Sequence, residues 1–248
     1  MMIKKLFSTG GLLSTMLISA VLVGLAVSRH QVLALLMVSA IEFYVWWRRH
    51  HSSLELAADT YASWMISLVA VVLVALSPQF ITQVALIVAF IAVRLLVHIG
   101  TLEKHPGTEA LIMQFASLMA IFSAAQVWRW PAAVVMVLAW GSSWLVAHRF
   151  LQLTGDKQIG LLAGVWSLVV AELAWILSWW MIAYLSPGAY LIVPQAALLV
   201  TGVAYVLGGI YRLHRASQLS RNRLVEYLVV ASVLLVIVLA GTRWNGAS

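Results

Sequence analysis

The sequence predicts an all-α integral membrane protein, a bundle of about nine transmembrane helices in one membrane domain. Hydrophobic residues make up 63% of the 248 residues and charged residues only 9%, and the mean hydropathy is +1.00. A soluble domain is excluded by this composition. The apolar segments run without interruption for roughly 16 to 25 residues, the length of a membrane-crossing helix, whereas barrel strands alternate over about ten.

The first four predicted spans are separated by charged or turn-forming residues. Lys4 and Lys5 precede the first span, and Arg48 and Arg49 end the second. The segment Ser52-Ser53-Leu54-Glu55 fits a capping box at the start of the third helix, and Ser77-Pro78-Gln79 predicts a tight turn before the fourth. These spans cover about 12–28, 32–47, 61–76 and 80–99.

The polar loop 100–108 is the plainest break, and five further spans follow it. Pro131 suits the first turn of the sixth span, Ser186-Pro187-Gly188 turns the chain after the seventh, and the basic loop 215–223 precedes the ninth. The five spans cover about 109–127, 131–148, 160–185, 192–212 and 225–242. The loops are too short for a water-soluble domain.

The first span also has the form of a signal peptide, with a basic start, an apolar stretch and Ala26-Val27-Ser28 as a cleavage site. We favour a retained helix, because the next apolar segment begins at Val32 and leaves little room for a peptidase. Cleavage would leave eight spans in the same orientation.

The distribution of lysine and arginine predicts a cytoplasmic N-terminus and an external C-terminus. With nine spans in this orientation, three cations, Arg29, Arg129 and Arg243, lie outside. Twelve lie inside: Lys4, Lys5, Arg48, Arg49, Arg94, Lys104, Arg149, Lys157, Arg212, Arg215, Arg221 and Arg223. The protein is therefore expected to cross the plasma membrane or an inner membrane several times.

Glu172 is the first candidate for a functional residue, because it lies near the middle of the span predicted for 160–185. Trp175 and Trp179 share its helix face, so we expect the carboxylate to face a packed, aromatic interior. An acid at this depth is costly and is a candidate proton or substrate site. The alternative is a protonated glutamate that is hydrogen-bonded to a neighbouring helix.

Glu42 and Arg94 are the second candidates. Each lies about five residues before the inner end of its span, so the two side chains are expected at similar depth. A buried ion pair between them would gate a pathway or lock two helices together. Alternatively, Arg94 extends to the inner head groups and Glu42 has another partner.

The remaining basic residues indicate lipid contacts. Histidines and arginines gather at cytoplasmic ends of spans, where they suit anionic head groups, and a phosphate-bearing ligand is the weaker option. The predicted head-group contacts are Arg48, Arg49, Arg149, Arg212 and Arg215. No metal site or cofactor is predicted, because no span carries histidines at ligand spacing and the chain has no cysteine. The cations lie at span ends, so nucleic acid is not an expected partner.

Two function classes remain. The first is a small transporter or channel-like permease that uses a mid-membrane carboxylate, with Gln83, Gln114, Gln126 and Gln195 as polar partners. The second is a non-catalytic scaffold, a lipid-associated protein or a subunit of a complex, with the bilayer, further copies or other subunits as partners. A lipid-modifying enzyme ranks third, since only Glu55, Asp59, His50 and His51 approach an acid–base set.

Overall fold

The computed structural model describes residues 9–28, 31–49, 55–77, 79–98, 106–179, 183–185, 192–215, 217 and 220–240. In these ranges the chain forms nine helices and one pair of short strands, so the predicted helical fold class is confirmed. The helices are α2 (Thr9–Ser28), α3 (Gln31–Arg49), α4 (Glu55–Leu76), α5 (Phe80–His98), α6 (Pro106–Trp128), α7 (Ala132–Leu153), α8 (Ile159–Ser178), α9 (Gln195–Arg215) and α10 (Arg221–Ala240).

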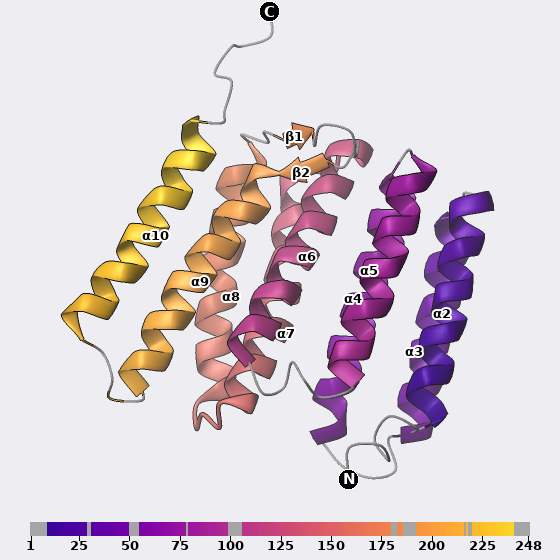
Figure 1. Cartoon of the computed structure of the whole chain (residues 1–248), viewed down its shortest axis with the longest axis horizontal. Coiled ribbons are helices and arrows are strands. Elements are labelled where there is room, and N and C mark those ends of the chain that lie inside the picture. Colours follow the sequence, from indigo (N-terminus) through magenta and orange to yellow (C-terminus); the bar gives the residue numbers. More distant parts are fainter. Residues whose placement is uncertain are drawn as a thin grey trace, which may run out of the picture.

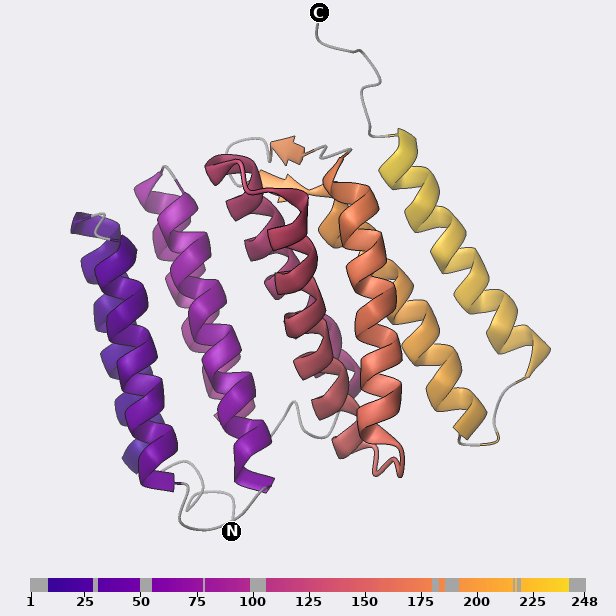
Figure 2. The ribbon, with the colours of Figure 1, turned by 180° about the vertical axis from the view of Figure 1, so that it is seen from behind.

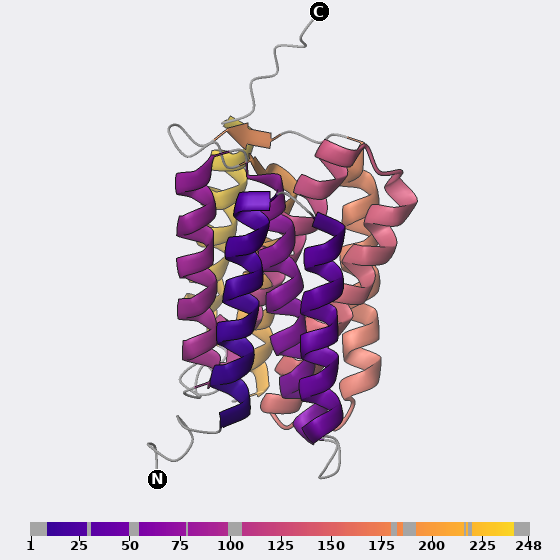
Figure 3. The same ribbon diagram turned by 90° about the vertical axis from the view of Figure 1, so that its right-hand side faces the viewer.

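The helices stand side by side and alternate in direction, which gives an elongated bundle with α10 at one edge and α2 and α3 at the other (Figures 1 and 2). The view along the bundle shows that it is more than one helix thick (Figure 3). We call the end at which α2 begins and α9 ends the basic end. Most of the described lysines and arginines belong to it, namely Arg94, Arg149, Lys157, Arg212, Arg215, Arg221 and Arg223, whereas Arg129 lies at the other end.

The two largest apolar cores among the described residues hold the bundle together, and α4 contributes to both. One core joins α2, α3 and α5 to the face of α4 that carries Val71 and Val74. The other joins α6, α7, α8 and α9 around Phe122, and it includes Leu73 of α4. The adjacent faces of one helix therefore connect the two halves of the molecule.

Four helical stretches are long and apolar enough to cross a membrane, judged by length and composition in the described part of the chain. They are Gly107–Trp128, Ala132–Leu153, Ile159–Ser178 and Gln195–Arg215. Shorter apolar stretches, Ser14–Ala26, Trp64–Leu76 and Phe80–Leu96, lie in α2, α4 and α5. These lengths support a membrane protein.

The structure corrects the span predicted for 160–185. Helix α8 ends at Ser178, and Ala183–Leu185 forms strand β1, which pairs antiparallel with strand β2, Ile192–Pro194. Tyr184 and Val193 are opposite each other in this pairing, and both residue types favour strands. A short apolar stretch does not distinguish helix from strand, which is why hydropathy alone extended the helix too far.

Candidate functional site

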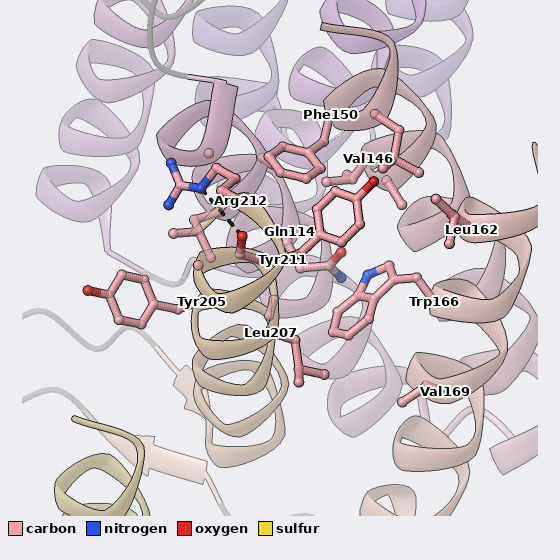
Figure 4. A pocket seen from close by; sticks show the side chains of 18 of the residues that line it. Gln114, Val146, Phe150, Leu162, Trp166, Val169, Tyr205, Leu207, Tyr211 and Arg212 are labelled. Carbon is pink, nitrogen blue, oxygen red and sulfur yellow. Dashed lines mark hydrogen bonds between the residues drawn. The ribbon is translucent and has the colours of Figure 1, made fainter. Parts of the chain in front are cut away.

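A cavity of about 330 Å³ lies among α6, α7, α8 and α9. Its floor and walls are mostly apolar, with Val146 and Phe150 from α7, Leu162 from α8 and Leu207 from α9. Figure 4 shows Leu162, Trp166 and Tyr211 near one another, whereas Tyr205 points away from them on the other side of α9. The volume lies at the small end of the range for ligand-binding cavities, roughly 300 to 1,000 Å³.

The cavity is open toward the side of the bundle. Helix α8 packs along α7 but touches α9 much less. Three apolar residues that line the cavity at the facing edges of α8 and α9 are exposed, Val165 by 55%, Val169 by 37% and Leu207 by 46%. An apolar molecule can therefore reach the cavity between α8 and α9.

Gln114 is an almost fully buried polar residue in the cavity wall, 1% exposed. Its Nε2 donates a hydrogen bond of 2.8 Å to Oγ of Ser143 on α7. Its Oε1 accepts no hydrogen bond from the part of the chain that the structure describes. A buried acceptor without a donor is costly, and it marks a place where a bound molecule can supply one.

Arg212 lines the cavity near the basic end, where its Nε donates to the carbonyl oxygen of Gly208 at 3.4 Å. Its guanidinium lies against the first turn of α6. A methyl group at Gly107 would overlap the guanidinium, so glycine at this position makes room for it. Gly107 and Arg212 thus place a positive charge at one end of an apolar cavity.

Two further polar clusters support the helices around the cavity. Arg149 of α7 pairs with Glu109 of α6, and both residues are buried. At the turn between α7 and α8, Asp156 accepts a hydrogen bond from the Tyr211 hydroxyl. It also accepts one of 2.8 Å from Nη1 of Arg215. These contacts tie α6 to α7 and the α7–α8 turn to α9.

Glu42 and Arg94 form the ion pair that the sequence predicts. The pair belongs to a buried network of four helices. The hydroxyl of Ser67 on α4 donates to Oε1 of Glu42 at 2.7 Å, and Nη1 of Arg94 donates to that hydroxyl at 2.6 Å. Nη2 of Arg94 donates to Oγ of Ser14 on α2 at 3.0 Å. The network lies in the α2–α5 half and does not line the cavity.

The expectation that Glu172 faces a packed interior is wrong. Glu172 is exposed, as are Trp175, by 40%, and Trp179, by 69%. The two indole rings contact each other edge to face, with centroids 6.2 Å apart, on the outer surface of α8. None of the three lines the cavity, and the structure does not bring them near Glu42 and Arg94, which belong to α3 and α5.

The small residues of α8 explain this orientation. Ala163, Ser167 and Ala171 are buried, and α8 makes its most extensive contact with α7. Helices in membranes approach one another through small residues, so the opposite, bulky face of α8 points outward. The four-residue spacing of Ala163, Ser167 and Ala171 is visible in the sequence, and it indicates the buried face of α8 better than the position of Glu172 does.

The predicted head-group contacts have different surroundings. Arg149 is only 5% exposed and pairs with Glu109, so its predicted lipid contact is wrong. Arg212 is half-buried at the cavity, and Arg215 is exposed at the basic end. The side chains of Arg48 and Arg49 lie outside the described residues.

Sequence reasoning missed the cavity, the role of Gly107 and the Glu109–Arg149 pair. The ion pair could have been predicted from the sequence. Glu109 lies in the first turn of one helix and Arg149 in the last two turns of the next, so the two side chains are at similar depth. No sequence pattern predicted the cavity, since its shape depends on how four helices pack. In the described part of the chain, no three His, Asp or Glu residues gather closely enough to hold a metal ion.

Comparison with models of known protein families, with curated proteins and with solved structures finds no match for this chain.

Proposed function

We propose that the protein is a multi-pass membrane protein with nine spans, a cytoplasmic N-terminus and an external C-terminus, in a plasma or inner membrane. The described ranges form nine helices of alternating direction, and these helices and the charge difference between the two ends support this topology. In this orientation the basic end, with Arg212 and Arg215, faces the cytoplasm.

We propose further that the protein is lipid-associated and binds an apolar chain in the cavity among α6, α7, α8 and α9. The observation that carries this function is the opening between α8 and α9, bordered by Val165, Val169 and Leu207. In a bilayer this opening meets hydrocarbon. Apolar cavities of this kind stay dry and accept apolar ligands, because a chain restores the dispersion contacts that an empty space lacks.

The permease that the sequence predicts stays a prediction, as does a role for Glu172, Trp175 and Trp179 in it. Their exposure on α8 favours a surface role over a pathway through the bundle. A membrane scaffold or subunit is compatible with lipid binding, since the exposed face of α8 is free to meet another protein. Lipid binding is favoured because it has a cavity of suitable size and access.

The test is to fill the cavity. Gly208 lines it, and a Cβ atom at this position has no neighbouring atom within 4 Å, so we expect the ring of Gly208→Phe to extend into the cavity. Gly141 of α7 also faces open space but does not line the cavity, so Gly141→Phe is the matched control. Binding of a fluorescent, uncharged monoacylglycerol is measured by anisotropy in detergent micelles.

We expect saturable binding by the wild-type protein and by Gly141→Phe, and a loss of affinity on the order of tenfold or more in Gly208→Phe, because the ring takes the place of the chain. Equal affinity in the two variants, or no saturable binding by the wild-type protein, would contradict lipid binding in the cavity.

A further inference from the structure

Arg212 differs from three other arginines of the bundle, each of which pairs with a carboxylate. Arg94 pairs with Glu42, Arg149 with Glu109 and Arg215 with Asp156. Among the residues that the structure describes, no carboxylate pairs with Arg212, and its Nε donates a hydrogen bond to a carbonyl of its own helix. The Nη1 and Nη2 groups therefore remain available to an anion at the edge of the cavity.

The surroundings of Arg212 add to its preference for an anion. Its guanidinium rests on Gly107, the second residue of α6. The N–H groups of a first helical turn and the helix dipole both favour negative charge. Glu109, the carboxylate in this turn, is bound by Arg149 and so does not neutralise Arg212. Phosphate and carboxylate both suit the fork of donors on a guanidinium.

Gln114 supplies an independent, deeper contact. It follows Gly107 by seven residues, which corresponds to about 10 Å along α6. Gln114 lines the cavity and its buried Oε1 accepts no hydrogen bond from the described residues, while Ser143 holds its Nε2 and fixes the amide in place. A ligand that fills the cavity thus meets a cation at one end and, about 10 Å further in, an acceptor that requires a hydroxyl or N–H group.

We propose that the cavity takes an anionic amphiphile with a single apolar chain. Arg212 binds its phosphate or carboxylate, the chain lies against Trp166 and Val146, and Gln114 accepts a hydrogen bond from a hydroxyl or amide group on the chain. This inference rests on the proposed lipid binding and adds to it the charge and polar pattern of the ligand. The chain enters between α8 and α9, and the head group stays at the basic end.

The experiment compares four probes: an alkyl phosphate, a fatty acid of the same chain length, the same fatty acid with a mid-chain hydroxyl group, and an uncharged monoacylglycerol. Dissociation constants are measured for the wild-type protein, Arg212→Gln and Gln114→Leu. Arg221→Gln is the control for loss of charge, since Arg221 is exposed at the same end and does not line the cavity.

We expect Arg212→Gln to weaken binding of both anionic head groups on the order of tenfold or more and to weaken monoacylglycerol binding much less, because that probe has no charge for Arg212 to bind. Arg221→Gln should match the wild-type protein. Gln114→Leu should remove only the advantage of the hydroxylated fatty acid. The ratio between alkyl phosphate and fatty acid identifies which head group the site prefers.

Equal binding of the anionic probes by Arg212→Gln and the wild-type protein overturns the anion site, while monoacylglycerol binding still supports the proposed function. If the wild-type protein binds none of the four probes, both proposals fail. If Arg212→Gln does not fold, Gly107→Ala replaces it, because its methyl group displaces the guanidinium and keeps the charge. We then expect weaker anion binding, and unchanged binding overturns the inference.

Discussion

Nε of Arg149 donates a hydrogen bond of 2.5 Å to Oε1 of Glu109, and both side chains are almost completely buried. The second oxygen, Oε2 of Glu109, has no hydrogen-bond partner in the described part of the chain. The pair joins α6 to α7 only two residues along α6 from Gly107. It therefore stabilises the wall of the cavity on which the position of Arg212 depends.

Removal of one member of this pair should destabilise the protein strongly. Arg149→Met leaves the Glu109 carboxylate buried and uncompensated, which is expected to cost about 3 to 5 kcal/mol of unfolding free energy. The double variant Glu109→Leu with Arg149→Met removes both charges and should recover most of this loss. Reversible unfolding in mixed micelles measures the difference, and a double variant less stable than Arg149→Met would contradict it.

The Glu42–Arg94 pair should behave as a coupled unit. Glu42→Arg and Arg94→Glu are each expected to reduce the folded yield, whereas the double reversal restores part of it, with a coupling of about 0.5 to 3 kcal/mol. Recovery is partial because Ser14 and Ser67 are placed for a guanidinium on α5. Strictly additive losses at normal membrane insertion would contradict the pairing.

The orientation of α8 predicts opposite effects at two of its positions. Ser167 is fully buried on the small face of the helix, so Ser167→Leu should overpack the core and cost about 1 to 3 kcal/mol. Glu172 is exposed near the middle of α8, where a carboxylate is costly in a membrane, so Glu172→Leu should not lower the unfolding free energy. Both are measured in mixed micelles. A large loss in Glu172→Leu would indicate that the acid has an internal role.

The proposed topology is testable because the chain contains no cysteine. A single cysteine replaces Ser217, exposed next to the basic end, or Ala133, exposed at the opposite end. In intact cells we expect a membrane-impermeant maleimide to label the Ala133→Cys variant and to label Ser217→Cys only after the membrane is opened. The reverse pattern would place the basic end outside.

Hydropathy and charge predicted the helical class and a helix within each of the nine expected spans, because length and composition decide these features. Depth along antiparallel helices predicted the Glu42–Arg94 contact. The direction in which a helix face points was predicted poorly, as Glu172 shows, because bulky residues suit both lipid and core. The cavity arises from gaps between four helices, and no local pattern in one helix predicts such a gap.

The four-helix network has a consequence for how the chain is made. Glu42 and Arg94 are 52 residues apart, so the ribosome adds Glu42 to the chain well before Arg94. At ~5–20 residues per second, Arg94 follows Glu42 after about 3 to 10 s. During that interval the hydroxyl of Ser67, which follows Glu42 by 25 residues, can donate to the carboxylate, but the charge of Arg94 is not yet present. We therefore expect α2, α3 and α4 to remain close to the insertion machinery until α5 emerges, so that this half of the protein enters the bilayer as one unit.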